Sequence, residues 1–248
     1  LYSSIHYNMD VFEEVGVEVP TTFDEFLDVC EKIKAAGITP IALKSDSWAG
    51  FIWFQHLLAA KDPQLYLDVC DGTKKYTDPE VVEVMNIWQD MFDKGYFGNP
   101  ISYQDINRQL ASGETAMELE DYSNITNLVN DYGMVSGENL GQFLFPSMDG
   151  EKDVTFYSVS PICVPAASKD KGSAMEVLKH YYENDVQNFL FESLGYVNTS
   201  NVEITDVTIQ SVFDDVEDSE NCIQLVRYYE NTPEEIRNFA LDELMKFE

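Results

Sequence analysis

Basic residues are scarce in this chain. Only 15 Lys and Arg stand against 45 Asp and Glu among 248 residues, which gives a formal net charge of −30. A field of that sign repels phosphate backbones and anionic membrane surfaces, so we expect no nucleic-acid partner. The acidic surface serves solubility or attracts a cationic ligand, and the composition does not decide between the two.

Long apolar runs are also missing. The nearest candidate, residues 51–60, is far shorter than a membrane-spanning helix. The chain begins with Leu1 and carries neither a charged start nor an apolar leader. We expect that it was cut from a longer chain, so the lack of a signal peptide does not point to the cytoplasm.

Cysteine is rare, and the common enzyme motifs are lacking. The four cysteines form no C-x-x-C pair, which argues against zinc and redox chemistry. Cys30, on the apolar stripe of a predicted helix, and Cys163, in a predicted apolar strand, are expected to be small buried side chains. The sequence lacks GxGxxG, P-loop, GxSxG and HExxH motifs. We therefore expect no cofactor, no metal and no catalytic residue.

Helices and strands are predicted to alternate with short joints. Thr22 and Glu25 form a capping-box pattern before an amphipathic helix that ends at Gly37, and a buried strand follows over 38–43. Another helix is expected to begin at Asp78, because Asp followed by Pro is a common helix start. This rhythm is typical of an α/β fold.

Two clusters of candidate ligand contacts follow predicted strands. Glu120, Asp121 and Tyr122 come after the strand 115–119, and Asp46 and Trp48 come after the strand 38–43. Sugars need aromatic faces to stack on and carboxylates to accept hydrogen bonds, and these clusters supply both. From the residues alone, an ordinary turn for the first cluster and a core role for Trp48 remain equally open.

Several motifs occur in an order that resembles one known family. The run 5–12 (IHYNMDVF) is similar to YN-x-D-L-F, 20–26 (PTTFDEF) to P-x-T-W-D-E-F, and 110–117 (LASGETAM) to F-x-x-G-x-x-A-M. These elements resemble the extracellular sugar-binding proteins of ABC transporters, the group that includes maltose-binding protein. The family often has Gly-Ser-Trp where this chain has 121–124 (DYSN), so Tyr122 would have to supply the stacking ring.

The resemblance implies a periplasmic-binding-protein-like two-lobe α/β fold, here mainly the second lobe plus part of the first. We expect the second lobe over 1–155, a segment returning to the first lobe over 156–225, and a C-terminal helical segment over 226–248. In such a clamp, ligand binding favours closure of two lobes. Tyr157 and Ser158 are then hinge candidates, although an ordinary sheet strand explains them equally well.

The function implied is the capture of a sugar or oligosaccharide and its delivery to ABC permease subunits in the membrane. The resemblance also implies a monomer outside the cell, either a membrane-anchored lipoprotein or a periplasmic protein. Two alternatives stay open: a carbohydrate-active enzyme on an α/β scaffold, and a binding module that signals to a membrane sensor.

Overall fold

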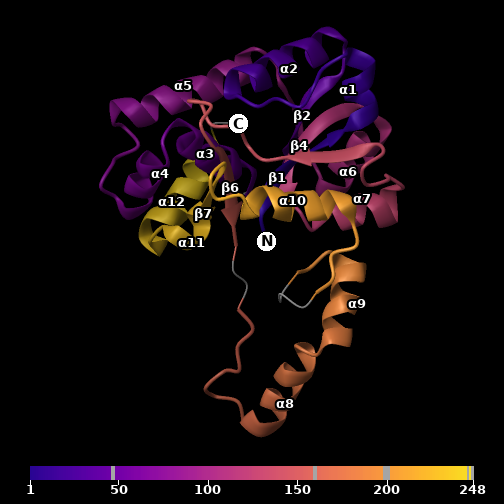
Figure 1. The fold of residues 1–248 in the computed structure, drawn as a ribbon. Coiled ribbons are helices and arrows are strands. Elements are labelled where there is room, and N and C mark those ends of the chain that lie inside the picture. Colours follow the sequence, from indigo (N-terminus) through magenta and orange to yellow (C-terminus); the bar gives the residue numbers. More distant parts are fainter. Residues whose placement is uncertain (46–47, 159–160, 198–201, 245, 247–248) are drawn as a thin grey trace.

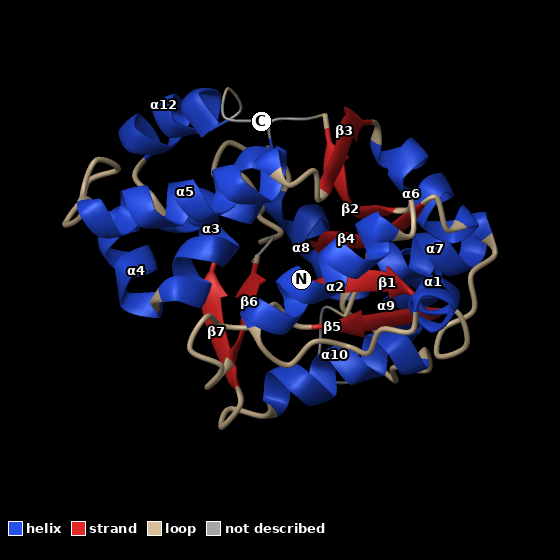
Figure 2. Cartoon of the chain, turned by 90° about the horizontal axis from the view of Figure 1, so that it is seen from above, coloured by secondary structure: helices blue, strands red, loops and turns tan. Residues whose placement is uncertain are grey.

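The computed structural model describes residues 1–45, 48–158, 161–197, 202–244 and 246 (Figure 1). A mixed five-stranded sheet lies at its centre, as the view from above shows (Figure 2). The strands of this sheet are β1 (Ser3–Asn8), β2 (Thr39–Lys44), β3 (Phe97–Ile101), β4 (Thr115–Asp121) and β5 (Leu140–Phe143). Their order is β3-β2-β4-β1-β5. β1 is antiparallel to β4 and β5, whereas β2 is parallel to β3 and β4.

A second, two-stranded sheet stands beside the first. It consists of β6 (Asp153–Tyr157) and β7 (Cys222–Val226), which run parallel and in register along their whole length. β6 ends at Tyr157, before Cys163, which was expected to lie in an apolar strand. Cys163 therefore lies beyond it, and its side chain is exposed. The expectation that Cys163 is buried was wrong, because β6 ends at Tyr157 and Cys163 lies outside both sheets.

Helices cover both faces of the larger sheet. The helices are α1 (Met9–Val15), α2 (Phe23–Ala35), α3 (Trp48–Lys61), α4 (Pro63–Asp71), α5 (Pro79–Asp93), α6 (Tyr103–Ser112), α7 (Asn124–Tyr132), α8 (Lys171–Tyr181), α9 (Asn184–Leu194), α10 (Val207–Glu217), α11 (Tyr228–Asn231) and α12 (Glu234–Leu244). α1 and α2 lie on one face, whereas α6, α7 and α10 lie on the other (Figure 1). The interior accordingly divides into two apolar clusters, the larger built around α2 to α5 and the smaller around α7 and α10.

Local sequence signals account for several helix ends. The Thr22 hydroxyl accepts a hydrogen bond from the Glu25 backbone N–H at 3.2 Å, and the Glu25 carboxylate accepts one from the Thr21 N–H at 2.8 Å. These bonds satisfy donors that the first turn of α2 leaves free. α1 ends at Gly16 with φ of 72°, a backbone conformation that glycine adopts without steric cost.

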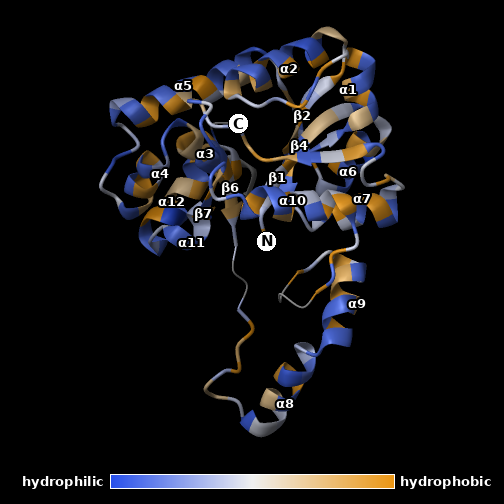
Figure 3. Ribbon diagram, in the orientation of Figure 1, coloured by the Kyte–Doolittle hydropathy of each residue, from blue (hydrophilic) through white to orange (hydrophobic). Residues whose placement is uncertain are grey.

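A helical arm projects from the body. Residues 161–197, with α8 and α9, extend away from the sheets, and apolar residues recur along the arm among polar ones (Figures 1 and 3). α8 buries none of its residues, and Val177 and Phe189 are 70% and 64% exposed. The end of α9 is anchored where Phe191 joins the smaller apolar cluster, and Val197 packs against the same cluster.

The part of the chain that leaves the body is shorter than the expected segment 156–225. α10 and β7 pack against β5 and β6, so residues 207–226 belong to the same body as residues 1–158. The division into two lobes stays a prediction. Among the described residues, the arm 161–197 is the part that leaves the body. The C-terminal segment contains the helices α11 and α12, and α12 contacts α3.

Candidate functional site

Two neighbouring parallel strands part at their carboxyl ends. The last paired residues of β2 and β4 are Ile41 and Met117. From there, β2 continues beside β3 to Lys44, and β4 continues beside β1 to Asp121. A crevice at the carboxyl ends of diverging strands is the usual place for a ligand in open α/β sheets.

A cavity of about 220 Å³, which we call the outer cavity, lies in this crevice. It is lined by Ser3, Lys44, Ile52, Leu119, Glu120, Asp121 and Arg227. These residues come from β1, β2, α3, β4 and the turn after β7. Five separate chain segments therefore meet around one opening.

Paired charges dominate the wall of the outer cavity. The Lys44 ammonium forms an ion pair with Glu120 and lies 5.3 Å from the centre of the Tyr103 ring. The Arg227 guanidinium contacts Glu230 at 2.5 Å and lies 3.8 Å from Asp121. The side chains of Lys44, Glu120, Asp121 and Arg227 are only 15–20% exposed. Such half-buried charges are held in fixed directions and remain accessible from the cavity.

Burial raises the pKa of Asp121 above its ordinary value, and the Arg227 guanidinium offsets part of this rise. The carboxyl group is thus easier to protonate than an exposed aspartate. A ligand hydroxyl that donates a hydrogen bond to it would favour the charged form and lower the pKa.

Of the predicted site residues, Glu120 and Asp121 come together at the outer cavity. The Asp121 backbone N–H also donates to a Glu120 carboxylate oxygen at 2.9 Å. Asp46 lies outside the described residues. Trp48 is the first residue of α3, the helix that brings Ile52 to the cavity.

Tyr122 occupies a different environment. Its side chain is 1% exposed, its hydroxyl accepts a hydrogen bond from the Val197 N–H at 3.1 Å, and its ring packs against Phe213. The contacts found for Tyr122 thus tie the body to the base of the arm. In this arrangement the ring has no free face for a ligand, so the expected stacking role gains no support.

Sequence reasoning missed both cations of the site. Lys44 ends a strand that was expected to stop at residue 43, and Arg227 follows β7, which was not predicted at all. Arg227 reaches Asp121 only through the parallel pairing of β6 with β7. A Lys or Arg directly after a short apolar strand is the one local signal that could have marked these positions.

The hinge candidates lie beside the start of the chain. Tyr157 forms an isolated antiparallel bridge with Tyr2, and the Ser158 N–H donates to the Leu1 carbonyl at 2.9 Å. Two segments at the edge of the body thus run side by side. A hinge role for Tyr157 and Ser158 stays a prediction.

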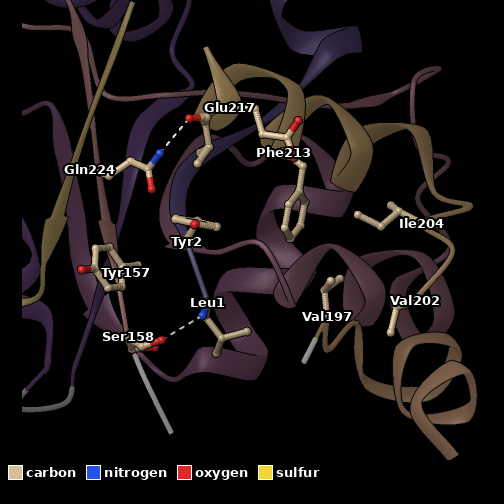
Figure 4. A pocket seen from close by; sticks show the side chains of 11 residues that line it. Leu1, Tyr2, Tyr157, Ser158, Val197, Val202, Ile204, Phe213, Glu217 and Gln224 are labelled. Atoms are coloured by element: carbon tan, nitrogen blue, oxygen red, sulfur yellow. Dashed lines mark hydrogen bonds between the residues drawn. The ribbon is translucent and has the colours of Figure 1, made fainter. Parts of the chain in front are cut away.

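A larger cavity of about 540 Å³ lies on the other side of these segments, between Tyr2, Tyr157 and α10 (Figure 4). The consecutive residues Tyr2 and Ser3 line different cavities. The lining of the larger cavity combines apolar side chains such as Phe213 and Ile204, which point inward, with the polar residues Glu217 and Gln224. A hydroxyl-rich ligand is better matched by the charged wall of the outer cavity, because oriented polar groups set direction and specificity.

The outer cavity is suited to holding a polar ligand. Its cations are matched by carboxylates, which can accept hydrogen bonds from hydroxyl groups while the cations donate. Among the described residues, no group of three or more His, Cys, Asp or Glu side chains could hold a metal ion. Within that same part of the chain, no helix has the length and apolar content needed to cross a membrane.

The fold and the crevice define a class of α/β solute-binding proteins. The sequence profile of the bacterial extracellular solute-binding proteins matches residues 2–188, and the chain belongs to this family.

Solved structures support the same fold. A chitin oligosaccharide binding protein superposes with a TM-score of 0.80 at 21% identity, covering 99% of this chain and 65% of its own. A sugar transporter protein from Bacillus licheniformis in complex with stachyose gives 0.78 at 15% identity, with 99% and 66% coverage. A binding protein, RafE, in complex with raffinose gives 0.74 at 18% identity, with 98% and 66% coverage. The two-lobe-type α/β fold is thereby confirmed.

Curated relatives match over short stretches. A multiple sugar-binding protein of Streptococcus mutans is 47% identical over 47 residues, which is 18% of this chain and 11% of the relative. A probable sugar-binding periplasmic protein of Mesorhizobium japonicum is 35% identical over 60 residues, 24% of this chain and 14% of the relative. The chain spans about two thirds of the solved structures that it matches.

Proposed function

We propose that this chain is the larger part of a protein that captures a sugar or oligosaccharide and delivers it to an ABC importer. The observation that carries the proposal is the outer cavity. Paired Lys44–Glu120 and Arg227–Asp121 charges line it at the carboxyl ends of diverging strands. Such a wall offers donors and acceptors in equal measure, as the hydroxyl groups of a neutral sugar require.

The arm 161–197 fits the first lobe of the expected two-lobe fold, most of which is outside this chain. Its exposed apolar side chains, such as Val177 and Phe189, have no cover among the described residues. About a third of each solved relative's chain has no counterpart here, which is enough to supply a covering lobe. Ligand bound between two lobes would favour the closed form, because only that form completes the contacts.

Delivery to permease subunits follows from the family rather than from this chain alone. The proposal that the protein is a monomer outside the cell, either lipid-anchored or periplasmic, also rests on the family. The name of the matching family supports the extracellular location. The anchoring and the permease contact are proposals that the full-length protein has to test.

The rival functions predict different observations. A carbohydrate-active enzyme would release smaller products from the oligosaccharide that it binds, whereas a binding protein returns it unchanged. A module that signals to a membrane sensor would bind the same sugar, but its gene would stand beside a sensor kinase rather than beside permease genes. The relatives are named as binding or transport proteins, which favours binding over catalysis.

A thermal-shift and calorimetry panel on the full-length protein tests the proposal. Raffinose, stachyose and chitin oligosaccharides are the first probes, because proteins of this fold are named for them or bind them. A ligand that binds only the folded state must raise the melting temperature with concentration. The variant Arg227→Met should abolish the shift and Arg108→Met, an exposed control, should keep it. Cooperative melting without a shift for any saccharide would refute sugar capture.

A further inference from the structure

A second, much smaller cavity lies behind the outer one. It has a volume of about 20 Å³ and shares Lys44, Ile52 and Leu119 with the outer cavity. We call it the inner cavity. Its remaining wall includes Glu118 and the side of Trp53. The two cavities therefore adjoin each other, and Lys44 belongs to the walls of both.

Glu118 is the acidic group of the inner cavity, and it is 2% exposed. Its Oε1 accepts a hydrogen bond from the Asn124 amide at 2.6 Å and lies 3.3 Å from His6 Nδ1. Its Oε2 is buried and accepts no hydrogen bond from any described residue. A carboxylate has about four acceptor sites, and a buried oxygen that stays unpaired costs free energy.

The neighbours of Glu118 hold its position. Asn124 and Asn107 exchange two hydrogen bonds of 3.1 Å, and both side chains are buried. Tyr103 donates to Asn124 from the other side. The carboxylate is thus fixed on β4 by α6 and α7, and its second oxygen cannot rotate toward solvent to find a partner.

The size of the inner cavity restricts what can bind there. A space of about 10–15 Å³ holds one water molecule, so about 20 Å³ accommodates one hydroxyl-sized group and no sugar ring. A metal ion is disfavoured, because Glu118 is the only carboxylate among the described residues of the wall and the basic residue Lys44 lines the same cavity. A neutral O–H donor meets both conditions.

We propose that the inner cavity is a subsite for a single hydroxyl group, which donates its hydrogen bond to Glu118 Oε2. Two sources share this chemistry: a water molecule, and a hydroxyl of a sugar held in the outer cavity. The sugar source rests on the proposed function, whereas the water source does not. In either case Glu118 acts at the site although it lies one layer beneath the surface residues.

The test is a crystal structure of the full-length protein at about 1.5 Å, free and with raffinose. We expect an oxygen atom within about 3 Å of Glu118 Oε2. Calorimetry with raffinose and its single-deoxy analogues then compares the wild type with E118Q. Because a hydrogen bond to a charged group is lost, a sugar source predicts about a tenfold to hundredfold loss of affinity in E118Q. E114Q makes the same change at an exposed glutamate just before β4 and should bind like the wild type.

Ala42→Val serves as a second variant in case E118Q fails to fold. Ala42 lines the inner cavity, so the added methyl groups should displace the occupant and leave the hydrogen bonds of Glu118 to Asn124 in place. The oxygen should therefore be absent from the structure of A42V.

The outcomes separate cleanly. Water is identified if an oxygen is present both without and with raffinose and no deoxy analogue reproduces the loss of affinity caused by E118Q. A raffinose oxygen at the site identifies a sugar hydroxyl if two binding results agree with it. One deoxy analogue should bind the wild type as weakly as raffinose binds E118Q, and E118Q should bind that analogue no more weakly than it binds raffinose. A wild-type structure without an oxygen there in either state overturns the proposal. Failure to bind any saccharide would count against the proposed function only, since the free structure still tests the cavity.

Discussion

The Lys44–Glu120 ion pair gives the sharpest test of the site. We predict that Lys44→Met lowers the free energy of unfolding by about 2–3 kcal/mol. The magnitude follows from burial: exposed pairs contribute roughly 0.2–1 kcal/mol, whereas breaking a buried pair costs about 3–5 kcal/mol. These side chains are 20% and 16% exposed, which places them between the two limits. Loss of the contact between the Lys44 ammonium and the Tyr103 ring adds about 0.5–1 kcal/mol.

A double-mutant cycle isolates the pair. K44M, E120Q and K44M/E120Q are unfolded with urea, and the free energies are obtained by linear extrapolation. We expect a coupling energy of about 1–2 kcal/mol, because the double variant leaves no unpaired charge in the crevice. The exposed pair Lys179–Glu176, 66% and 72% exposed on the arm, is the matched control and should give less than about 0.5 kcal/mol. Equal coupling energies in the two cycles would refute the claim that the crevice holds its charges in fixed positions.

Three further predictions concern the arm, the small sheet and the thiols. Gly195→Ala should lower the melting temperature, because φ is +71° and an added Cβ would lie 3.1 Å from backbone atoms of Ser123; a normal melting temperature would contradict this. Burial, with the neighbouring Asp215 charge, raises the pKa of Asp153 to about 6. The contribution of Asp153 to stability is therefore full below about pH 4 and is lost as pH rises through about 6. Asp153→Asn should thus gain stability relative to the wild type over this window, as melting curves at several pH values would show. In the native 248-residue chain, a thiol reagent should modify Cys163 rapidly and the three buried cysteines only on unfolding; Cys163→Ser should abolish the rapid phase.

Much of the fold follows from local sequence patterns. The capping residues of α2, the Asp–Pro start of α5 and the glycine after α9 each mark an observed helix end. Such signals act within one or two turns, so they can be recognised in the sequence without knowledge of the fold. α10 and β7 were not predicted, and their positions depend on packing against β5 and β6 rather than on a strong local pattern.

The site was predictable only in part, for a physical reason. Glu120 and Asp121 stand at the end of a strongly apolar strand, which marks them in the sequence. Arg227 is brought to Asp121 from more than a hundred residues away, and nothing in its own surroundings indicates that contact. Glu118 is an acidic residue inside the apolar strand itself. Its burial can be understood only with His6 and Asn124 in place.

The pairing of β6 with β7 has a consequence for biosynthesis. The arm is inserted between these strands, so β6 has to wait for about 64 further residues (158–221) before its partner is made. At roughly 5–20 residues per second, the ribosome needs about 3–13 s for this stretch. During that interval the edge of β6 that later pairs with β7 is open, and an open strand edge is a site for aggregation and for chaperone binding. Because closing a loop of twice the length costs only about 0.6 kcal/mol more, a longer arm would change the equilibrium little and would mainly prolong this exposed interval.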